Sequence, residues 1–295
     1  MDKIHTPVLL KESLEALNIN PDGFYIDCTL GDGGHSFEIF SRLSDKGLLL
    51  SIDQDQYAID FVKDFYKENI KKNWIIKRSN FRKIDELVSQ LNRKPNGILL
   101  DLGLSSRQLE LSHDRGFSYK EESEPLDMRM NPDFGVTAKD LLNALSEKQL
   151  TNLFREYGEE KFAHRIAKEI KKAENPLETV GDLTRLIYKA SPADNSNKNP
   201  SRRVFQALRI VVNDELESLQ EALDKSFEIL QSGGRISVIS FHSLEDRIVK
   251  NFFNNKARSG EGKLLFESHI APTDEERRDN PRSASAKLRT IIKKK

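Results

Sequence analysis

The sequence predicts an α/β fold, a doubly wound and mostly parallel sheet interrupted by an all-helical insertion. Short apolar runs alternate with helical patterns through the first third of the chain, which is typical of a parallel sheet crossed by helices. A long helical stretch without a convincing strand follows, and a strand pattern then returns. The chain has 295 residues, enough for two domains at roughly 100 to 200 residues each.

The first third is expected to hold four strands with helices between them. The expected strands are 24–29, 48–53, 74–78 and 97–102. Apolar residues recur at helical spacing in the segments between them, which predicts helices at 35–44, 56–69 and 82–92.

The middle of the chain is too long for one crossover and has a helical pattern. Capping signals at Thr137 and Ser146 predict helix starts, another helix begins at about Asp182, and 193–201 is a polar loop. One long helix is expected over 204–230, and the remaining strands over 235–241, 263–270 and 287–294. We therefore expect one domain from 1–108 and 205–295, with a helical domain of 109–204 inserted into it.

Composition indicates a soluble, globular, cytoplasmic protein. Hydrophobic residues make up 37% and charged residues 32%, which excludes a membrane protein and a disordered chain. The single cysteine, Cys28, cannot form an internal disulfide, so a reducing compartment is expected. Because 47 basic residues balance 47 acidic ones, any nucleic-acid surface must be a local patch. The candidate patches are Lys198, Arg202, Arg203 and Arg209, and Lys287, Arg289 and Lys293 to Lys295. The alternative for the second patch is a solvated tail, which is the usual role of lysines at a C-terminus.

A glycine-rich turn follows the first expected strand. The segment DCTLGDGGH (27–35) leads from the strand into a helix, and its glycines allow a ligand to approach the backbone closely. Asp53 ends the second strand 19 residues beyond Gly34, where a carboxylate can accept both hydroxyls of a ribose. A plain structural turn is the alternative, but turn and acid together favour a cofactor that contains adenosine.

Details of the turn favour S-adenosylmethionine over a dinucleotide. The dinucleotide fingerprint begun at Gly31 requires Gly or Ala at position 36, where this chain has Ser36. Asp27, at the end of the first strand, suits a sulfonium better than a pyrophosphate. A nicotinamide dehydrogenase is therefore the disfavoured alternative.

Further polar residues are expected where other strands end. Asp101 ends the fourth strand at the edge where open sheets bind ligands, although it could instead cap the following turn. His242 and Glu245, in SFHSLEDR (240–247), could act as acid or base at the same edge, or be structural.

An ordered set of motifs then carries a family resemblance that spans nearly the whole chain. The motifs are HTPVLLKE (5–12), DCTLGDGGH (27–35), DLGLSSRQ (101–108), RGFS (115–118), PLDMRM (125–130), NPSRRVFQALRIVVN (199–213), SFHSLEDR (240–247) and NPRSASAKLR (280–289). Together they resemble the bacterial small-subunit ribosomal RNA methyltransferase H family, which methylates N4 of a cytosine in 16S rRNA.

The resemblance implies a class I S-adenosylmethionine methyltransferase (Rossmann-like) sheet with an inserted all-helical domain. It implies that Gly33, Gly34 and His35 meet the methionine part of the cofactor, that Asp53 binds the ribose, and that Phe81 lies beside the adenine. It assigns the remaining cofactor contacts to Asp101 and Gln108. The partner it implies is 16S rRNA within the small ribosomal subunit.

The reaction that the resemblance implies needs a site that activates a poor nucleophile. An exocyclic amine has its lone pair delocalised into the ring, so a hydrogen-bond acceptor and positioning are needed. Many amino-methyltransferases place an acid or amide, two prolines and an aromatic residue after the fourth strand, and DLGLSS (101–106) lacks the prolines and the aromatic. No residue is therefore assigned as catalytic, no metal is expected, and monomer and homodimer stay open.

Substrate recognition is expected to come largely from the insertion and its flanks. Arg202, Arg203, Arg209, Phe117 and Phe241 are the candidates for contact with an unstacked RNA base. Two rival functions keep the cofactor: methylation of another amine on DNA, protein or a small molecule, and a non-catalytic role in ribosome assembly.

Overall fold

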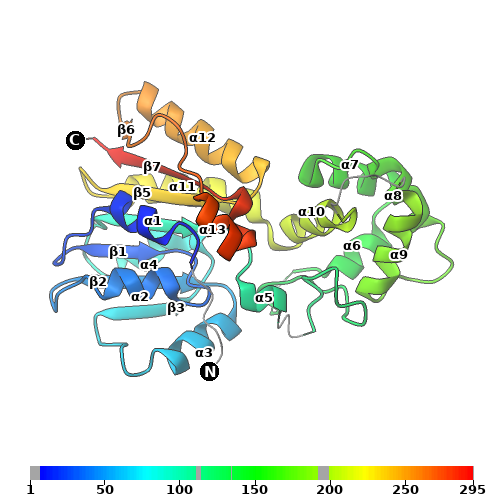
Figure 1. Cartoon of the computed structure of the whole chain (residues 1–295), viewed down its shortest axis with the longest axis horizontal. Helices are drawn as coiled ribbons and strands as arrows, with labels where there is room; N and C mark the ends of the chain where they lie inside the picture. Colours follow the sequence, from blue (N-terminus) through cyan, green and yellow to red (C-terminus); the bar gives the residue numbers. More distant parts are fainter. Residues whose placement is uncertain (1–6, 111–113, 134, 192–198, 295) are drawn as a thin grey trace. The chain divides into compact units, whose positions relative to one another are not determined.

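The computed structural model describes residues 7–110, 114–133, 135–191 and 199–294, which belong to two compact units. The first unit comprises Met1–Ser105 and Leu216–Lys295, and the second comprises Ser106–Glu215 (Figure 1). The second unit extends further along the chain than the expected boundary at 204/205. The reason is α10 (Ser201–Asn213), which packs against α7 (Glu147–Gly158) and buries Val204 and Leu208.

The first unit is built on a sheet of seven strands within the described residues, in the order β3-β2-β1-β4-β5-β7-β6. These strands are β1 (Phe24–Asp27), β2 (Leu48–Asp53), β3 (Trp74–Arg78), β4 (Gly97–Asp101), β5 (Arg235–Ser240), β6 (Gly262–Leu264) and β7 (Lys287–Lys293). Neighbours among β1 to β5 are parallel, whereas β7 runs antiparallel to both β5 and β6. The α/β class predicted from the sequence is confirmed.

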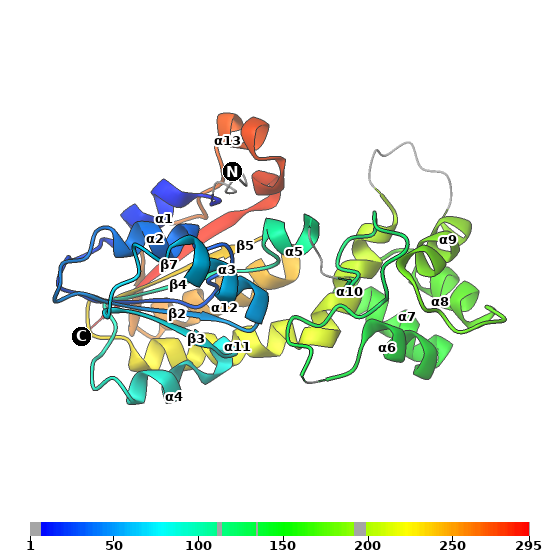
Figure 2. The same ribbon diagram turned by 90° about the horizontal axis from the view of Figure 1, so that it is seen from below.

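Successive strand residues face opposite sides of the sheet, and each side is covered by its own helices. Tyr25, Leu49 and Leu99 pack with α1 (Leu10–Leu17), α2 (Gly34–Phe40) and α3 (Gln56–Phe65). The residues beside them, such as Ile26, Leu50 and Ile98, pack with α4 (Ile84–Ser89), α11 (Glu215–Ile229) and α12 (Ser243–Arg258). Figure 2 shows α1 and α2 on one side of the sheet and α4 and α11 on the other. This alternation at a period of two follows from the strand geometry.

Short elements complete the first unit. The 3-10 helix η1 (Phe81–Lys83) leads into α4. Between β6 and β7 lie α13 (Asp274–Asp279) and the 3-10 helix η2 (Pro281–Ser285). The strand expected at 263–270 is much shorter: beyond β6, the Leu265 N–H donates to the Thr290 carbonyl at 3.0 Å and Ile270 forms an isolated bridge to Leu288.

The second unit is helical throughout its described elements. It contains α5 (Ser106–Glu110), α6 (Ala138–Ala144), α7, α8 (Ala163–Lys171), α9 (Val180–Ala190) and α10. Thr137 and Ser146 form capping boxes at the starts of α6 and α7, as their sequence signals predict. The helix expected near Asp182 is α9, which begins after the N-cap Thr179. Most of the polar loop expected at 193–201 lies outside the described residues.

The prediction of a single long helix over 204–230 is wrong, because this segment forms two helices, α10 and α11. Asp214 lies between them in the left-handed conformation, with a φ of 50°, which no α-helix can continue through. The apolar periodicity runs across this break, so the pattern alone could not reveal it. The helix α1 was also missed, since no helix was predicted before the first strand.

Candidate functional site

Three aspartates end neighbouring strands at one edge of the sheet. Asp27, Asp53 and Asp101 are the last residues of β1, β2 and β4, and these strands are adjacent and parallel. In open parallel sheets, ligands bind in the crevice outside the carboxyl ends of the strands. The edge expected from the sequence is therefore the edge at which the structure gathers these acids.

The glycine turn connects β1 to α2 and depends on a left-handed backbone. Gly31 and Gly33 have φ values of 51° and 83°, which favour glycine. A Cβ added at Gly33 would lie 2.9 Å from side-chain atoms of Val62 and Tyr66, and one at Gly34 would collide with Cγ of Pro7. The two glycines thus let the turn pack closely against other parts of its own chain.

Asp53 lies across the turn and is held by backbone donors. The Gly31 N–H donates to Oδ2 of Asp53 at 2.9 Å, and the Asp55 N–H donates to Oδ1 at 2.9 Å. Desolvation by the surrounding protein raises the pKa of Asp53 to about 6, although these two bonds oppose the increase. The side chain is half-buried, so a carboxylate with one donor on each oxygen still faces the edge.

His35, in the first turn of α2, forms an ion pair with Asp101 at the end of β4. Nδ1 of His35 lies 3.4 Å from Oδ2 of Asp101, and His35 is 5% exposed. Burial opposes protonation of His35, but Asp101 and Asp27 outweigh it, so the pKa of the imidazole is raised. The other carboxylate oxygen, Oδ1 of Asp101, is buried and has no hydrogen-bond partner among the residues that the structure describes. A buried unpaired acceptor of this kind is costly and marks a place for a ligand donor.

Asp27, which was expected to suit a nearby sulfonium, is fully buried and hydrogen-bonded within the protein. The Ser36 hydroxyl donates to Asp27 Oδ2 at 2.6 Å, and the Thr29 N–H donates to Oδ1 at 3.0 Å. Ser51 Oγ lies 2.7 Å from the Ser36 hydroxyl and accepts the Trp74 indole N–H at 2.9 Å. Desolvation raises the pKa of Asp27. Ser36, which argued against a dinucleotide, is therefore a buried partner of Asp27.

The remaining predicted cofactor residues occupy different places. Phe81 is the first residue of η1 and packs, partly buried, against the core beneath α4 and α11. Gln108 lies in α5 and is buried, but it belongs to the second unit. The structure therefore brings together Gly33, Gly34, His35, Asp53 and Asp101 at one edge. The roles of all seven residues in cofactor binding stay predictions.

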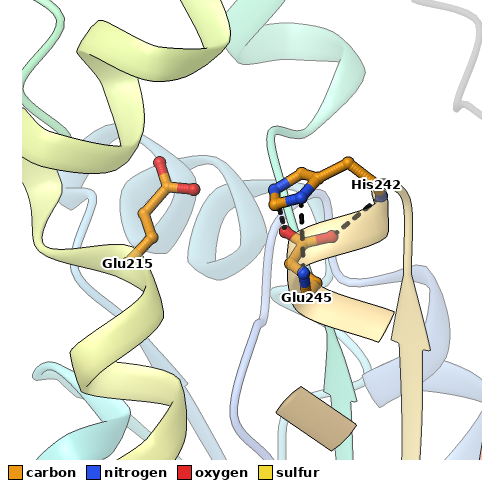
Figure 3. Close-up of side chains that lie close together, drawn as sticks. All are labelled: Glu215, His242 and Glu245. Carbon is orange, nitrogen blue, oxygen red and sulfur yellow. Dashed lines mark hydrogen bonds and ion pairs between the residues drawn. The ribbon is translucent and has the colours of Figure 1, made fainter. Parts of the chain in front are cut away.

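His242 and Glu245 form a helix cap. Glu245 Oε2 accepts the backbone N–H groups of Phe241 and His242 at 2.8 and 3.2 Å, and His242 Nδ1 accepts the Glu245 N–H at 3.4 Å. Figure 3 shows both side chains at the start of α12, where Nε2 of His242 lies 3.0 Å from Oε1 of Glu245. Of the two interpretations left open by the sequence, these contacts favour the structural one.

Of the candidate RNA-contacting residues, two are exposed, and the other three are ion-paired, buried or half-buried. Arg202 and Arg203 are exposed near the start of α10. Arg209 makes two bonds of 2.8 Å to the Glu215 carboxylate, and Phe117 is buried under the Arg115 guanidinium. Phe241 is half-buried in the first unit. Arg202 and Arg203 are thus the accessible members of this set.

Two contacts at the glycine turn were not anticipated from the sequence. Thr29 Oγ1 accepts the Asp101 N–H at 2.7 Å and so joins the ends of β1 and β4. Pro7 and Val8 lie against Gly34 and His35. The segment HTPVLLKE contributed to the resemblance, but nothing in its residue types indicated what it contacts. In the part of the chain that the structure describes, no helix is long and apolar enough to cross a membrane.

The parallel sheet with its antiparallel β7, and the glycine turn facing an acid at the end of β2, define a class I methyltransferase. The chain belongs to the MraW methylase family, whose model matches residues 2–294.

Comparisons with individual proteins agree with this family. The chain is 45% identical to a ribosomal RNA small subunit methyltransferase H of Fusobacterium nucleatum, over 99% of this chain and 98% of that protein. It is 46% identical to the protein of the same name in Caldicellulosiruptor saccharolyticus, over 98% of this chain and 99% of that protein. A crystal structure described as an rRNA methylase of Clostridium thermocellum shares the fold, with a TM-score of 0.51 and 11% identity, covering 98% and 100% of the two chains.

Proposed function

We propose that this protein transfers a methyl group from S-adenosylmethionine to the exocyclic N4 of a cytosine in 16S rRNA of the small ribosomal subunit, in the cytoplasm. The observation that carries the proposal is the edge formed by the glycine turn, Asp53 and Asp101. The family supports it, because relatives that match almost the full length of the chain are ribosomal RNA small subunit methyltransferases.

The residues present fit this cofactor. Each oxygen of the Asp53 carboxylate accepts one backbone N–H and retains a lone pair for a ribose hydroxyl. The buried Oδ1 of Asp101 has no donor within the described part of the chain, and a ligand N–H would supply one. Gly33, Gly34 and His35 would meet the methionine part, Phe81 the adenine, and Gln108 a further cofactor contact.

The bound cofactor would supply an electrophilic methyl group, and the protein would have to orient the amine. A cytosine N4 is a weak nucleophile, so most of the rate enhancement must come from positioning and from exclusion of water. The acids at this edge also favour a sulfonium electrostatically, since Asp53 and Asp101 end β2 and β4, the two strands on either side of β1.

The second unit would recognise the RNA. Arg165 and Lys168 are exposed, and their spacing of three residues in α8 brings their side chains to one face of that helix. Lys161 is exposed in the turn that precedes α8. Within the described residues, none of the three makes an ion pair with a carboxylate; Arg165 lies over the Phe162 ring at 5.9 Å. Together with the exposed Arg202, these cations suit contact with RNA phosphates. We call Arg165 and Lys168, together with Lys161 in the turn before the helix, the α8 basic face.

The test is methyl transfer to small subunits from a strain that lacks the gene. Purified protein and labelled S-adenosylmethionine are expected to place the label on one cytosine N4 of 16S rRNA, and subunits from the parent strain are expected to accept none. Cofactor binding without transfer would reject this acceptor and point to another amine or to a role in assembly. If the protein binds no S-adenosylmethionine, the proposed methyl transfer is rejected altogether.

A further inference from the structure

The segment Pro7–Leu9 lies on the glycine turn and its histidine. A Cβ added at Gly34 would collide with the Pro7 ring, so this ring rests directly on the Gly34 backbone. The Val8 backbone contacts the His35 imidazole and contributes to its raised pKa. We call Pro7–Leu9 the strap. Neither the predicted site nor the proposed chemistry uses it.

Leu9 ends the strap in a conformation that its side chain does not favour. Its φ of 52° and ψ of 36° lie in the left-handed region, which is uncommon for residues with a Cβ. The leucine side chain is fully buried beside Val8, Ile239 and Leu288. Residues with strained backbones persist only where surrounding contacts hold them, and such residues often occur near functional sites.

Glu276 provides the contact that holds the Leu9 backbone. The Leu9 N–H donates to Oε1 of Glu276 at 2.7 Å, a bond between residues 267 positions apart. Hydrogen bonds to a charged acceptor are stronger than neutral ones. Glu276 is itself fixed, because its own N–H donates to the N-cap hydroxyl of Thr273 at 3.1 Å. Figures 1 and 2 both show α13 near the beginning of α1.

These contacts form a continuous chain from α13 to the predicted cofactor edge. Glu276 holds Leu9, the strap carries Pro7 and Val8 onto Gly34 and His35, and His35 pairs with Asp101. All of these residues belong to the first unit.

We propose that Glu276 is a positioning residue for the glycine turn: by holding Leu9 it keeps Pro7 on Gly34 and Val8 on His35, in the arrangement that binds S-adenosylmethionine. The inference rests on the proposed function for the identity of the cofactor. Its structural part rests only on contacts within this chain.

Four variants of the full chain test the inference. Glu276→Ala removes the acceptor, whereas Glu276→Gln keeps a carbonyl oxygen that can accept the Leu9 N–H. Glu275→Ala is the matched control, because Glu275 is exposed on the same helix and makes no hydrogen bond or ion pair within the described residues. Pro7→Ala leaves Glu276 intact and removes the ring from Gly34.

Two measurements are made on each variant. Calorimetric titration is expected to show S-adenosylmethionine binding weakened about tenfold in Glu276→Ala, a typical size for coupling between separate sites. Pro7→Ala should weaken binding in the same direction, while Glu276→Gln and Glu275→Ala stay within about twofold of the wild type. The pH titration of the His35 ring is followed by NMR without cofactor. Its midpoint should be lowered in Glu276→Ala and unchanged in Glu276→Gln and Glu275→Ala.

Each outcome decides the inference. Unchanged cofactor affinity and an unchanged His35 titration in Glu276→Ala would overturn it, as would equal losses in Glu275→Ala. If Glu276→Ala does not fold, Pro7→Ala decides, and wild-type affinity in that variant would overturn the inference. If the wild type binds no S-adenosylmethionine, the proposed function fails, and the His35 titration alone decides whether Glu276 positions the turn.

Discussion

At the scale of single residues, Asp53 carries a charge that the protein without ligand disfavours. Desolvation raises its pKa to about 6, so the folded chain binds a proton between about pH 4 and pH 6 that the unfolded chain does not. Proton binding by Asp53 therefore stabilises the folded state fully at a pH below the pKa of Asp53 in the unfolded chain, and this stabilisation is lost as the pH rises through about 6. A carboxylate kept charged at such a cost at neutral pH is typical of a binding site.

The affinity for S-adenosylmethionine is expected to depend on the charge of Asp53. If the ionised carboxylate accepts the ribose hydroxyls, affinity should fall about tenfold from pH 7 to pH 5, because the pKa of Asp53 is about 6. Titration calorimetry across this range measures the effect. His35 also titrates, with a raised pKa, so the measurement is repeated in His35→Asn. An affinity that is independent of pH in that variant would contradict the assignment of Asp53.

Ser36 is expected to matter for stability through Asp27. Ser36→Ala removes a 2.6 Å donor from a fully buried carboxylate and should lower the free energy of unfolding by about 1 to 3 kcal/mol at pH 7. Urea denaturation measures this change. Ser41→Ala is the control on the same segment: Ser41 is exposed, and its removal should change stability by less than about 0.5 kcal/mol. Equal losses in the two variants would refute the explanation.

At the scale of elements, local signals predicted where helices begin better than where they end. Capping boxes act within four residues, so the starts of α6 and α7 could be inferred from Thr137 and Ser146. The break at Asp214 has no capping signal of this kind, because aspartate adopts the left-handed conformation only occasionally and its presence alone does not predict a helix end. The shortness of β6 likewise depends on pairing with the distant β7, which local pattern cannot reveal.

Ser146 provides a test of the capping box at α7. Ser146→Ala should lower the free energy of unfolding by about 1 kcal/mol, because the N-cap hydroxyl that accepts the Gln149 N–H and donates to the Gln149 side chain is lost. Ser146→Asp should retain most of the stability, since aspartate caps equally well. Circular dichroism during urea denaturation gives both values. A destabilised Ser146→Asp would show that capping is not what Ser146 contributes.

At the scale of the whole molecule, the sequence predicted the fold class, the family and the edge of the sheet that gathers the acids. The strands of the parallel part of the sheet follow from apolar runs that alternate with helical patterns, whereas the order of the strands was not predicted. The contacts of Pro7 and Glu276 were not accessible, because they join segments far apart in the sequence. The complete burial of Asp27 depends in the same way on Ser36 and on the strands around it.

The neutral net charge makes local surfaces decisive for RNA binding. Substituting alanine for all three residues of the α8 basic face should weaken binding to small subunits and reduce its salt dependence by up to about three charges, with unchanged cofactor affinity. Filter binding at several salt concentrations measures both quantities. The control substitutes alanine for Lys67, Lys71 and Lys72, which are exposed in the first unit. This variant loses the same three positive charges. Equal effects of the two triple variants would show that the α8 basic face has no special role.

The insertion of the second unit between β4 and β5 also determines the order in which the chain can fold. These strands pair along their length, yet β4 ends at Asp101 and β5 begins at Arg235. At about 5 to 20 residues per second, the ribosome begins β5 roughly 7 to 27 s after it completes β4. During this interval a nascent chain presents β4 as an open, apolar edge, the kind of surface that aggregates. We expect chains stalled at residue 234 to be captured by chaperones and released chains to escape them, so each copy of the protein must be protected before it can act.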